Sequence, residues 1–175
     1  MIIVEGPDGA GKTHLANRIC EQFGLKYERY DKLSSTRGPD GLGIVEWWDD
    51  QLAADSSGVY DRCFYISEPI YQLATPGRKL LIDGHKMLEG ISRLINFQPL
   101  LIFCLPPWEA AIANIGQKER LEGVDDDALE KIHWAYWTSL AHWGEMMFGN
   151  VIRWDYIHHN ETHLLDAVEA YQEGG

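Results

Sequence analysis

Short apolar runs alternate along the chain with longer segments in which apolar residues recur every three or four positions. The first run, Ile2 to Val4, precedes a helical stripe of Leu15, Ile19 and Phe23. Strands are predicted at residues 2–4, 26–31, 59–61, 100–105 and 151–154. Helices are predicted behind the first strand as far as Gly24, and at 44–52, 68–73, 87–95, 108–115, 125–147 and 164–171. This alternation is typical of α/β proteins.

Two segments leave more than one interpretation open. The run from Lys79 to Asp83 ends in a carboxylate, as a metal-binding strand does, but the helical spacing behind it favours Asp83 as a helix cap. The adjacent Trp47 and Trp48 cannot both face a core from one side of a helix. One or both could therefore contact a base, although packing alone also accounts for them.

Composition and charge narrow the class of protein. The 175 residues are 45% hydrophobic and 24% charged, which predicts one globular domain over residues 1–175. No apolar run is long enough to cross a bilayer and no secretion signal precedes the first strand, so we expect a cytoplasmic protein with no membrane partner. The formal charge of −12 opposes binding to a polynucleotide, whereas a small nucleotide that carries its own Mg²⁺ is compatible with it.

The cysteines and the histidines near the end of the chain form no ligand pattern. The cysteines are odd in number and share no CxxC spacing, which predicts reduced thiols. The histidines lack a partnering cysteine, so solvated surface positions are favoured over a metal site. These residues are Cys20, Cys63, Cys104, His158, His159 and His163.

A glycine-rich segment follows the first strand directly and leads into the first helix. It reads Gly6-Pro7-Asp8-Gly9-Ala10-Gly11-Lys12-Thr13, and His14 comes next. In this order of strand, loop and helix, main-chain N–H groups turn inward around phosphate oxygens and the helix dipole adds to the positive field. Lys12 would reach the β- and γ-phosphates, and the Thr13 hydroxyl would hold Mg²⁺. The segment therefore predicts a site for ATP and Mg²⁺.

A second polar pair stands at the end of the predicted strand 59–61. Ligands of parallel α/β sheets collect at the carboxyl ends of strands. Asp61 could there reach the hydration shell of Mg²⁺, and Arg62 could bind a phosphate in bidentate fashion. A simple ion pair between the two at the strand end is the alternative.

Together these motifs resemble the thymidylate kinase-like branch of P-loop nucleoside monophosphate kinases, particularly its small phage-type members. Family members begin Glu-Gly-x-Asp-Gly-x-Gly-Lys-[Ser/Thr], and residues 5–13 match this pattern with Glu5 at its start. The family's Asp-Arg motif after the third strand matches Asp61 and Arg62. The resemblance implies a P-loop NTPase three-layer sandwich, with a five-stranded parallel sheet flanked by helices and a short lid at residues 116–124. Members often form homodimers, and a phage-encoded member would work in the cytoplasm of its host.

The resemblance also implies roles for individual residues. Asp8 would lie near the acceptor sugar or the metal, and Arg62 would grip the acceptor phosphate. The glycine loop carries no basic residue before Lys12, as in members whose catalytic arginine comes from the lid. This points to Arg120 as the catalytic arginine, with Lys118 as the alternative.

The base pocket is expected from three further segments. The family's Ser-x-x-x-Tyr-Gln pattern resembles Ser67, Tyr71 and Gln72, although Tyr-Gln stands one residue further from Asp61 than in cellular thymidylate kinases. Arg37 and Trp48 are additional candidates for substrate contacts.

The chemistry that fits these residues is transfer of the ATP γ-phosphate to a deoxynucleoside 5′-monophosphate, dTMP or a related pyrimidine. Such an acceptor already carries an anionic oxygen, so no general base is needed. A nucleoside or modified-base kinase is an alternative, because a carboxylate after the second strand, Asp31 or Glu28, could deprotonate a hydroxyl. A nucleotide-dependent switch or ATPase without a phosphate acceptor is an alternative of another class. Its GTPase version is excluded because no Asn-Lys-x-Asp motif follows a predicted strand.

Overall fold

A five-stranded parallel sheet forms the centre of the protein. The computed structural model describes residues 1–29, 42–54, 57–77, 79–115, 126–147 and 149–174. The strand order is β2-β3-β1-β4-β5, and every neighbouring pair is parallel. The strands are β1 (Ile2–Glu5), β2 (Lys26–Arg29), β3 (Gly58–Asp61), β4 (Leu100–Cys104) and β5 (Val151–Trp154). The predicted sheet is confirmed; Tyr30 and Asp31, included in the predicted second strand, lie outside the described residues.

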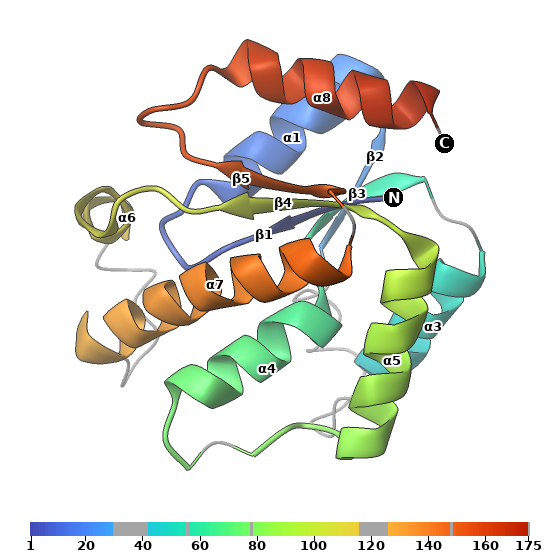
Figure 1. The fold of residues 1–175 in the computed structure, drawn as a ribbon, viewed down its shortest axis with the longest axis vertical. Helices are drawn as coiled ribbons and strands as arrows, with labels where there is room; N and C mark the ends of the chain where they lie inside the picture. Colours follow the sequence, from blue (N-terminus) through green and yellow to red (C-terminus); the bar gives the residue numbers. More distant parts are fainter. Residues whose placement is uncertain (30–41, 55–56, 78, 116–125, 148, 175) are drawn as a thin grey trace.

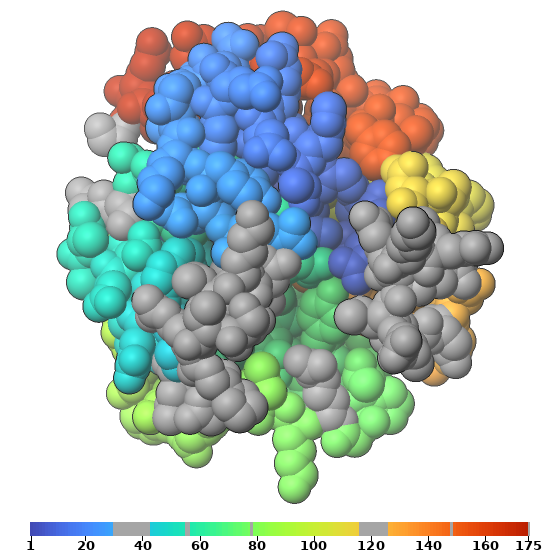
Figure 2. Space-filling view, turned by 180° about the vertical axis from the view of Figure 1, so that it is seen from behind, coloured from blue at the N-terminus to red at the C-terminus, as the bar shows by residue number. Residues whose placement is uncertain are grey.

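Helices cover both faces of this sheet (Figure 1). One face carries α1 and α8, and the other carries α3, α4, α5 and α7, while α6 lies beyond the carboxyl ends of the strands. The bounds are α1 Lys12–Phe23, α3 Leu42–Ala53, α4 Phe64–Ala74, α5 Gly84–Phe97, α6 Trp108–Asn114, α7 Asp126–Met146 and α8 Glu161–Glu173. Seen from behind, residues 1–29 (blue) reach the surface between α8 (red) and α3 (cyan) (Figure 2). None of the helices in the described part of the chain combines the length and the hydropathy that a membrane span requires.

The central strands are buried because helices pack on both of their faces. All residues of β1, β3 and β4 are buried, as is usual for the inner strands of a parallel sheet. The register sets Val4 beside Asp61 of β3 and beside Ile102 of β4. The carboxyl ends of β1 and β3 are therefore neighbours, although their residues are more than fifty positions apart in the sequence.

Several helix ends agree with the sequence and one does not. Asp83 caps α5 by accepting a hydrogen bond from the His85 N–H at 2.9 Å, so the alternative of a metal-binding strand at 79–83 is wrong. Asn160 caps α8 in the same way. The helix predicted at 68–73 begins at Phe64 instead. Its first four residues are all buried, so they lack the one-sided apolar pattern that marks a surface helix.

The two tryptophans of α3 both pack against the core. Trp48 is 0% exposed, and its ring centre lies 5.1 Å from those of Trp47 and Tyr60. Trp47 is partly buried at the margin of the same cluster. Packing accounts for the apolar surface of Trp48, while its buried Nε1–H has no hydrogen-bond partner among the described residues, and a contact of Trp48 with the substrate stays a prediction.

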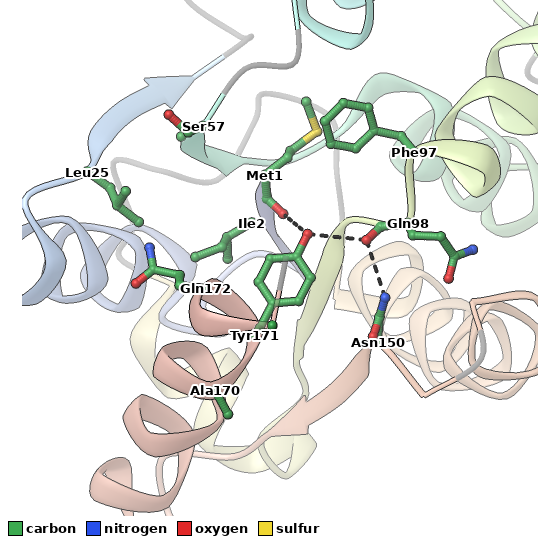
Figure 3. Close-up of a pocket in the computed structure, with 12 residues that line it drawn as sticks. Met1, Ile2, Leu25, Ser57, Phe97, Gln98, Asn150, Ala170, Tyr171 and Gln172 are labelled. Carbon is green, nitrogen blue, oxygen red and sulfur yellow. Dashed lines mark hydrogen bonds between the residues drawn. The ribbon is translucent and has the colours of Figure 1, made fainter.

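A hollow of about 710 Å³ opens at the amino ends of β1, β3 and β4, which is the end of the sheet opposite the carboxyl ends of the strands (Figure 3). The Tyr171 hydroxyl of α8 lies 3.2 Å from the carbonyl oxygens of Met1 and Gln98, and the Asn150 side chain donates to Gln98. These bonds tie the last helix to the sheet.

We expect Gly90→Ala to lower the free energy of unfolding by about 1–3 kcal/mol. Gly90 is buried where α5 packs on α4, and a Cβ at this position would clash with the ring of Tyr65. Urea denaturation would measure the change. Gly144→Ala in α7 is the matched control, because a Cβ there meets no atom within 4 Å and the alanine should stabilise the helix by up to about 1 kcal/mol. Equal effects of the two substitutions would contradict the expectation.

Candidate active site

The glycine loop between β1 and α1 has a main-chain conformation that residues with a Cβ could not adopt without strain or clashes. Gly9 has a φ of 75° and Gly6 a φ of 148°, both in the region that favours glycine. A Cβ at Gly6 would clash with the carbonyl oxygen of Cys104, and one at Gly9 would clash with that of Ala111. The loop therefore lies directly against the end of β4 and against α6.

Lys12 is the first residue of α1 and lies inside this loop. Its side chain is 7% exposed, and its ammonium donates a hydrogen bond of 2.6 Å to the carbonyl oxygen of Pro7. Burial and, secondarily, repulsion from Arg62 lower the pKa of Lys12 to about 8, against attraction from Asp8 and Asp61. Burying this cation costs solvation free energy, and an anionic ligand bound in the loop would offset that cost.

Next to the loop, Asp61 ends β3 as a buried carboxylate. Its Oδ2 accepts hydrogen bonds from the Thr13 hydroxyl at 2.6 Å and from the Tyr27 hydroxyl at 2.8 Å. Burial, followed by the bond to Asp61, raises the pKa of Tyr27 to about 12, so this phenol stays a donor. A hydroxyl and a carboxylate beside the glycine loop fit Mg²⁺, which takes few protein ligands and completes its shell with water and phosphate oxygens.

Arg62 follows Asp61 and directs its guanidinium toward the loop. Its Nη2 is 2.5 Å from Asp8 Oδ1, and its Nη1 is 3.0 Å from the Tyr136 hydroxyl. The guanidinium carbon also lies 5.6 Å from the centre of the Tyr71 ring. Arg62 has a φ of 79°, a conformation that non-glycine residues adopt mainly where the surroundings impose it. The alternative of an ion pair between Asp61 and Arg62 is wrong, because Arg62 pairs with Asp8.

Glu5, the last residue of β1, is fully buried beneath Arg62. It accepts hydrogen bonds from the Cys63 N–H at 2.5 Å, the Ser67 hydroxyl at 2.9 Å and the Tyr136 hydroxyl at 3.0 Å. Burial raises the pKa of Glu5, while the charge of Arg62 and these hydrogen bonds oppose the rise. Glu5 was expected only as part of the motif at residues 5–13, and Tyr136 was not expected at the site at all. The available signal for Glu5 was a charged residue at the end of an otherwise apolar strand.

The other expected site residues divide into two groups. Tyr71 lies beside Arg62, and the neighbouring Gln72 of α4 is partly buried. His14 is exposed on α1. Four residues, and with them the expected lid, lie outside the described residues: Asp31, Arg37, Lys118 and Arg120.

A second hollow, of about 360 Å³, opens on the outer side of the glycine loop. Its lining includes Gly11 and His14 of the loop and helix, Asn114 of α6, and Tyr156 after β5. The Tyr156 hydroxyl accepts a hydrogen bond of 2.5 Å from Asn114, whose side chain also donates to the carbonyl oxygen of Gly9. The hollow is therefore continuous with the loop that would hold phosphates.

Comparisons with known proteins agree with this architecture. No protein-family model matches the chain. A cytidylate kinase from Staphylothermus marinus is 24% identical over 128 residues, which cover 70% of this chain and 64% of that protein. The match thus spans less than two thirds of the relative's length.

Solved structures are similar over nearly the whole chain. The YorR protein of Bacillus subtilis, in complex with phosphorylated GDP, has a TM-score of 0.66 at 15% identity and covers 98% of this chain and 95% of its own. The deoxyadenosine kinase of M. mycoides with bound dCTP has a TM-score of 0.59 at 16% identity, with full coverage of both chains. Shikimate kinase from Acinetobacter baumannii has a TM-score of 0.54 at 13% identity, covering 99% and 92%. These likenesses show that the chain has the α/β fold of such kinases.

Proposed function

We propose that the protein transfers the γ-phosphoryl group of ATP, with Mg²⁺, to the 5′-phosphate of a deoxynucleoside monophosphate. The proposal rests on one observation above all. The 2.5 Å contact between Arg62 and Asp8 brings a guanidinium from the end of β3 against the phosphate-binding loop. A donor site and a cationic acceptor site therefore face each other at one end of the sheet, as phosphoryl transfer requires.

In this proposal the protein aligns the reactants and neutralises their charge. Lys12 and the main-chain N–H groups of residues 6–13 bind the ATP phosphates, and the second hollow receives the donor base. Thr13 and Asp61 hold Mg²⁺, which draws the phosphate oxygens together and offsets their charge when it is bound. Arg62 binds the acceptor phosphate, whose own oxygen is the nucleophile. Arg120 or Lys118 would add positive charge at the transferred group.

The acceptor is proposed to be dTMP or a related pyrimidine monophosphate, in line with the resemblance to small phage-type thymidylate kinases. Tyr71, Gln72 and Arg37 are the proposed contacts to its base. The named relatives, a cytidylate kinase and a deoxyadenosine kinase, support a small nucleotide or nucleoside as the acceptor. A single domain that works as a homodimer in the cytoplasm completes the proposal.

A panel of acceptors tests this function. The purified protein would be incubated with ATP, Mg²⁺ and dTMP, dCMP, dAMP, dGMP or the matching nucleosides, and the products identified by mass. We expect a diphosphate from at least one monophosphate. If the folded, ATP-binding protein makes no diphosphate from any of them, the proposed function is wrong.

The likeness to a deoxyadenosine kinase favours a nucleoside kinase as the second candidate. Such an enzyme needs a base for the hydroxyl. Glu28 of β2 forms an ion pair with Lys26, so Asp31 is the stronger candidate for that role. Asp31→Asn should abolish a nucleoside kinase but leave most of a monophosphate kinase's activity. ATP hydrolysis that is independent of any acceptor would instead favour an ATPase.

We expect Asp61→Asn to raise the Mg²⁺ concentration for half-maximal activity by about ten- to a hundred-fold, the usual effect of losing a group that orients a metal site. The amide lacks the negative charge that attracts the cation, and its nitrogen cannot accept a hydrogen bond from the Thr13 hydroxyl. Initial rates across a Mg²⁺ titration measure the shift. Asp83→Asn is the matched control, because asparagine caps α5 as well as aspartate does and the cap lies outside the site. An unchanged Mg²⁺ dependence in Asp61→Asn would refute the proposed metal role.

A further inference from the structure

The two terminal nitrogens of Arg62 lie in different surroundings. Nη1 donates to the hydroxyl of Tyr136, which is 0% exposed and in turn donates to the buried Glu5. Nη2 pairs with Asp8, whose side chain is 39% exposed. The guanidinium therefore has one buried, fixed side and one side that faces the loop and the solvent.

These two sides should differ in how readily their partners exchange. Tyr136 is packed between α4 and the sheet, and its hydroxyl has both a donor and an acceptor at 3.0 Å. A buried and fully satisfied polar contact of this kind is rigid. The pair with Asp8 involves a partly exposed carboxylate, and partly exposed ion pairs are weak because water competes for both charges. An incoming anion can replace Asp8 but not Tyr136.

We propose that Tyr136 is the positioning residue of Arg62: it fixes Nη1 so that Nη2 can exchange the Asp8 carboxylate for the phosphate of the acceptor. The inference rests on the proposed function. Glu5 supports this role because its carboxylate accepts a hydrogen bond from the Tyr136 hydroxyl. This bond turns a lone pair of the hydroxyl oxygen toward Nη1. The main-chain N–H of Arg62, bonded to the Val4 carbonyl at 2.9 Å, fixes the base of the same side chain.

A matched control exists within the same core. Tyr65 is also 0% exposed, and its hydroxyl also donates to a carboxylate, Asp49 Oδ1, at 2.8 Å. Tyr65→Phe and Tyr136→Phe therefore delete the same atom, a hydroxyl that donates to a carboxylate, although Asp49 is 29% exposed and Glu5 is 0% exposed. Only Tyr136 contacts Arg62, so only Tyr136→Phe should alter acceptor binding.

The test compares steady-state kinetics of the two variants with the monophosphate that the wild type converts fastest. We expect Tyr136→Phe to raise the acceptor KM about tenfold or more, as for a lost hydrogen bond to a charged group. The ATP KM should stay within about twofold, since the Tyr136 hydroxyl is bonded to Arg62 and Glu5 and not to the glycine loop. Tyr65→Phe should leave both KM values near the wild-type values, although both variants should have a lower Tm.

A second variant, Glu5→Gln, tests the same network without removing Tyr136. The amide NH₂ would compete with Arg62 for the hydroxyl oxygen, so the acceptor KM should again rise, and it should rise more than the ATP KM, which Glu5 can affect only through its bond of 3.4 Å from the Gly6 N–H. If Tyr136→Phe and Glu5→Gln both fold and have the same acceptor KM as Tyr65→Phe, the positioning role is wrong. Turnover by the wild type would in that case still support the proposed function. If the wild type converts no monophosphate, both the function and this inference are overturned.

Discussion

Replacing Lys12 with methionine should lower kcat by about 10²–10³-fold, the usual effect of removing one preorganised group that stabilises charge in a transition state. Methionine preserves most of the side-chain volume, so α1 should still begin at this position. The variant loses the cation that lies inside the glycine loop, 7% exposed and bonded to the Pro7 carbonyl. Initial rates at saturating ATP and acceptor measure the loss.

The matched control for Lys12 is Lys26→Met. Lys26 is exposed on β2, outside the loop, and forms an ion pair with Glu28. Exposed pairs of this kind contribute little to stability, and Lys26 lies outside the proposed site. The variant should therefore fold normally, and its kcat should remain within about twofold of the wild type. A Lys12 variant with near wild-type turnover would contradict the proposed donor site.

The pKa of Lys12 adds a dependence on pH that can be measured without activity. Its folded-state pKa of about 8 lies below its ordinary value of 10.5, so between these pH values the unfolded chain binds more protons than the folded one. The contribution of Lys12 to the free energy of unfolding therefore rises with pH across this window. Urea denaturation from pH 7.5 to 10 should show this rise in the wild type relative to Lys12→Met. An identical pH profile in the two proteins would mean that Lys12 is not perturbed.

Replacing Arg62 with glutamine should lower kcat/KM for the acceptor by about 10³-fold and leave the ATP KM within a few-fold. The side chain supplies the only proposed cation for the acceptor phosphate among the described residues, and charge-assisted contacts to phosphate are strong. The free energy of unfolding should also fall by about 3 kcal/mol, because a buried carboxylate that Arg62 reaches through Tyr136 would lose the nearby positive charge that offsets its burial. That carboxylate is Glu5, which is 0% exposed.

The stability of the Arg62 variant should also depend on pH. Burial already raises the pKa of Glu5, and loss of the opposing guanidinium raises it further. A carboxyl with a raised folded-state pKa binds more protons in the folded protein, so its contribution to stability falls as pH rises through that pKa. The destabilisation by Arg62→Gln should therefore be smaller at pH 5 than at pH 7.5 in urea denaturation.

Arg93→Gln is the control for both measurements on Arg62. Arg93 pairs with Asp49 at 3.0 Å, and its side chain is 48% exposed, so its removal should have little effect on stability and none on acceptor kinetics. If Arg62→Gln behaved like Arg93→Gln in kcat/KM, Arg62 would not be the acceptor's phosphate ligand.

The elements that the sequence predicted well share a local physical cause. The glycine loop was recognisable because its conformation demands glycines at fixed spacing after a buried strand. Asp83 was recognisable as a cap because a cap is a bond within two residues of the chain. The start of α4 at Phe64 was missed because its first turn is buried on all sides and shows no amphipathic period.

The sequence by itself determined the α/β class, the glycine loop between the first strand and the first helix, and the presence of Asp61 and Arg62 at a strand end, since these follow from local spacing and periodicity. Only the tertiary structure decided which partners those groups have. The register of β1 with β3 brings Arg62 to Asp8, and the packing of α7 brings Tyr136 to Glu5, 131 residues away in sequence. No local pattern records such contacts, because they exist only when distant segments of the chain are buried against each other.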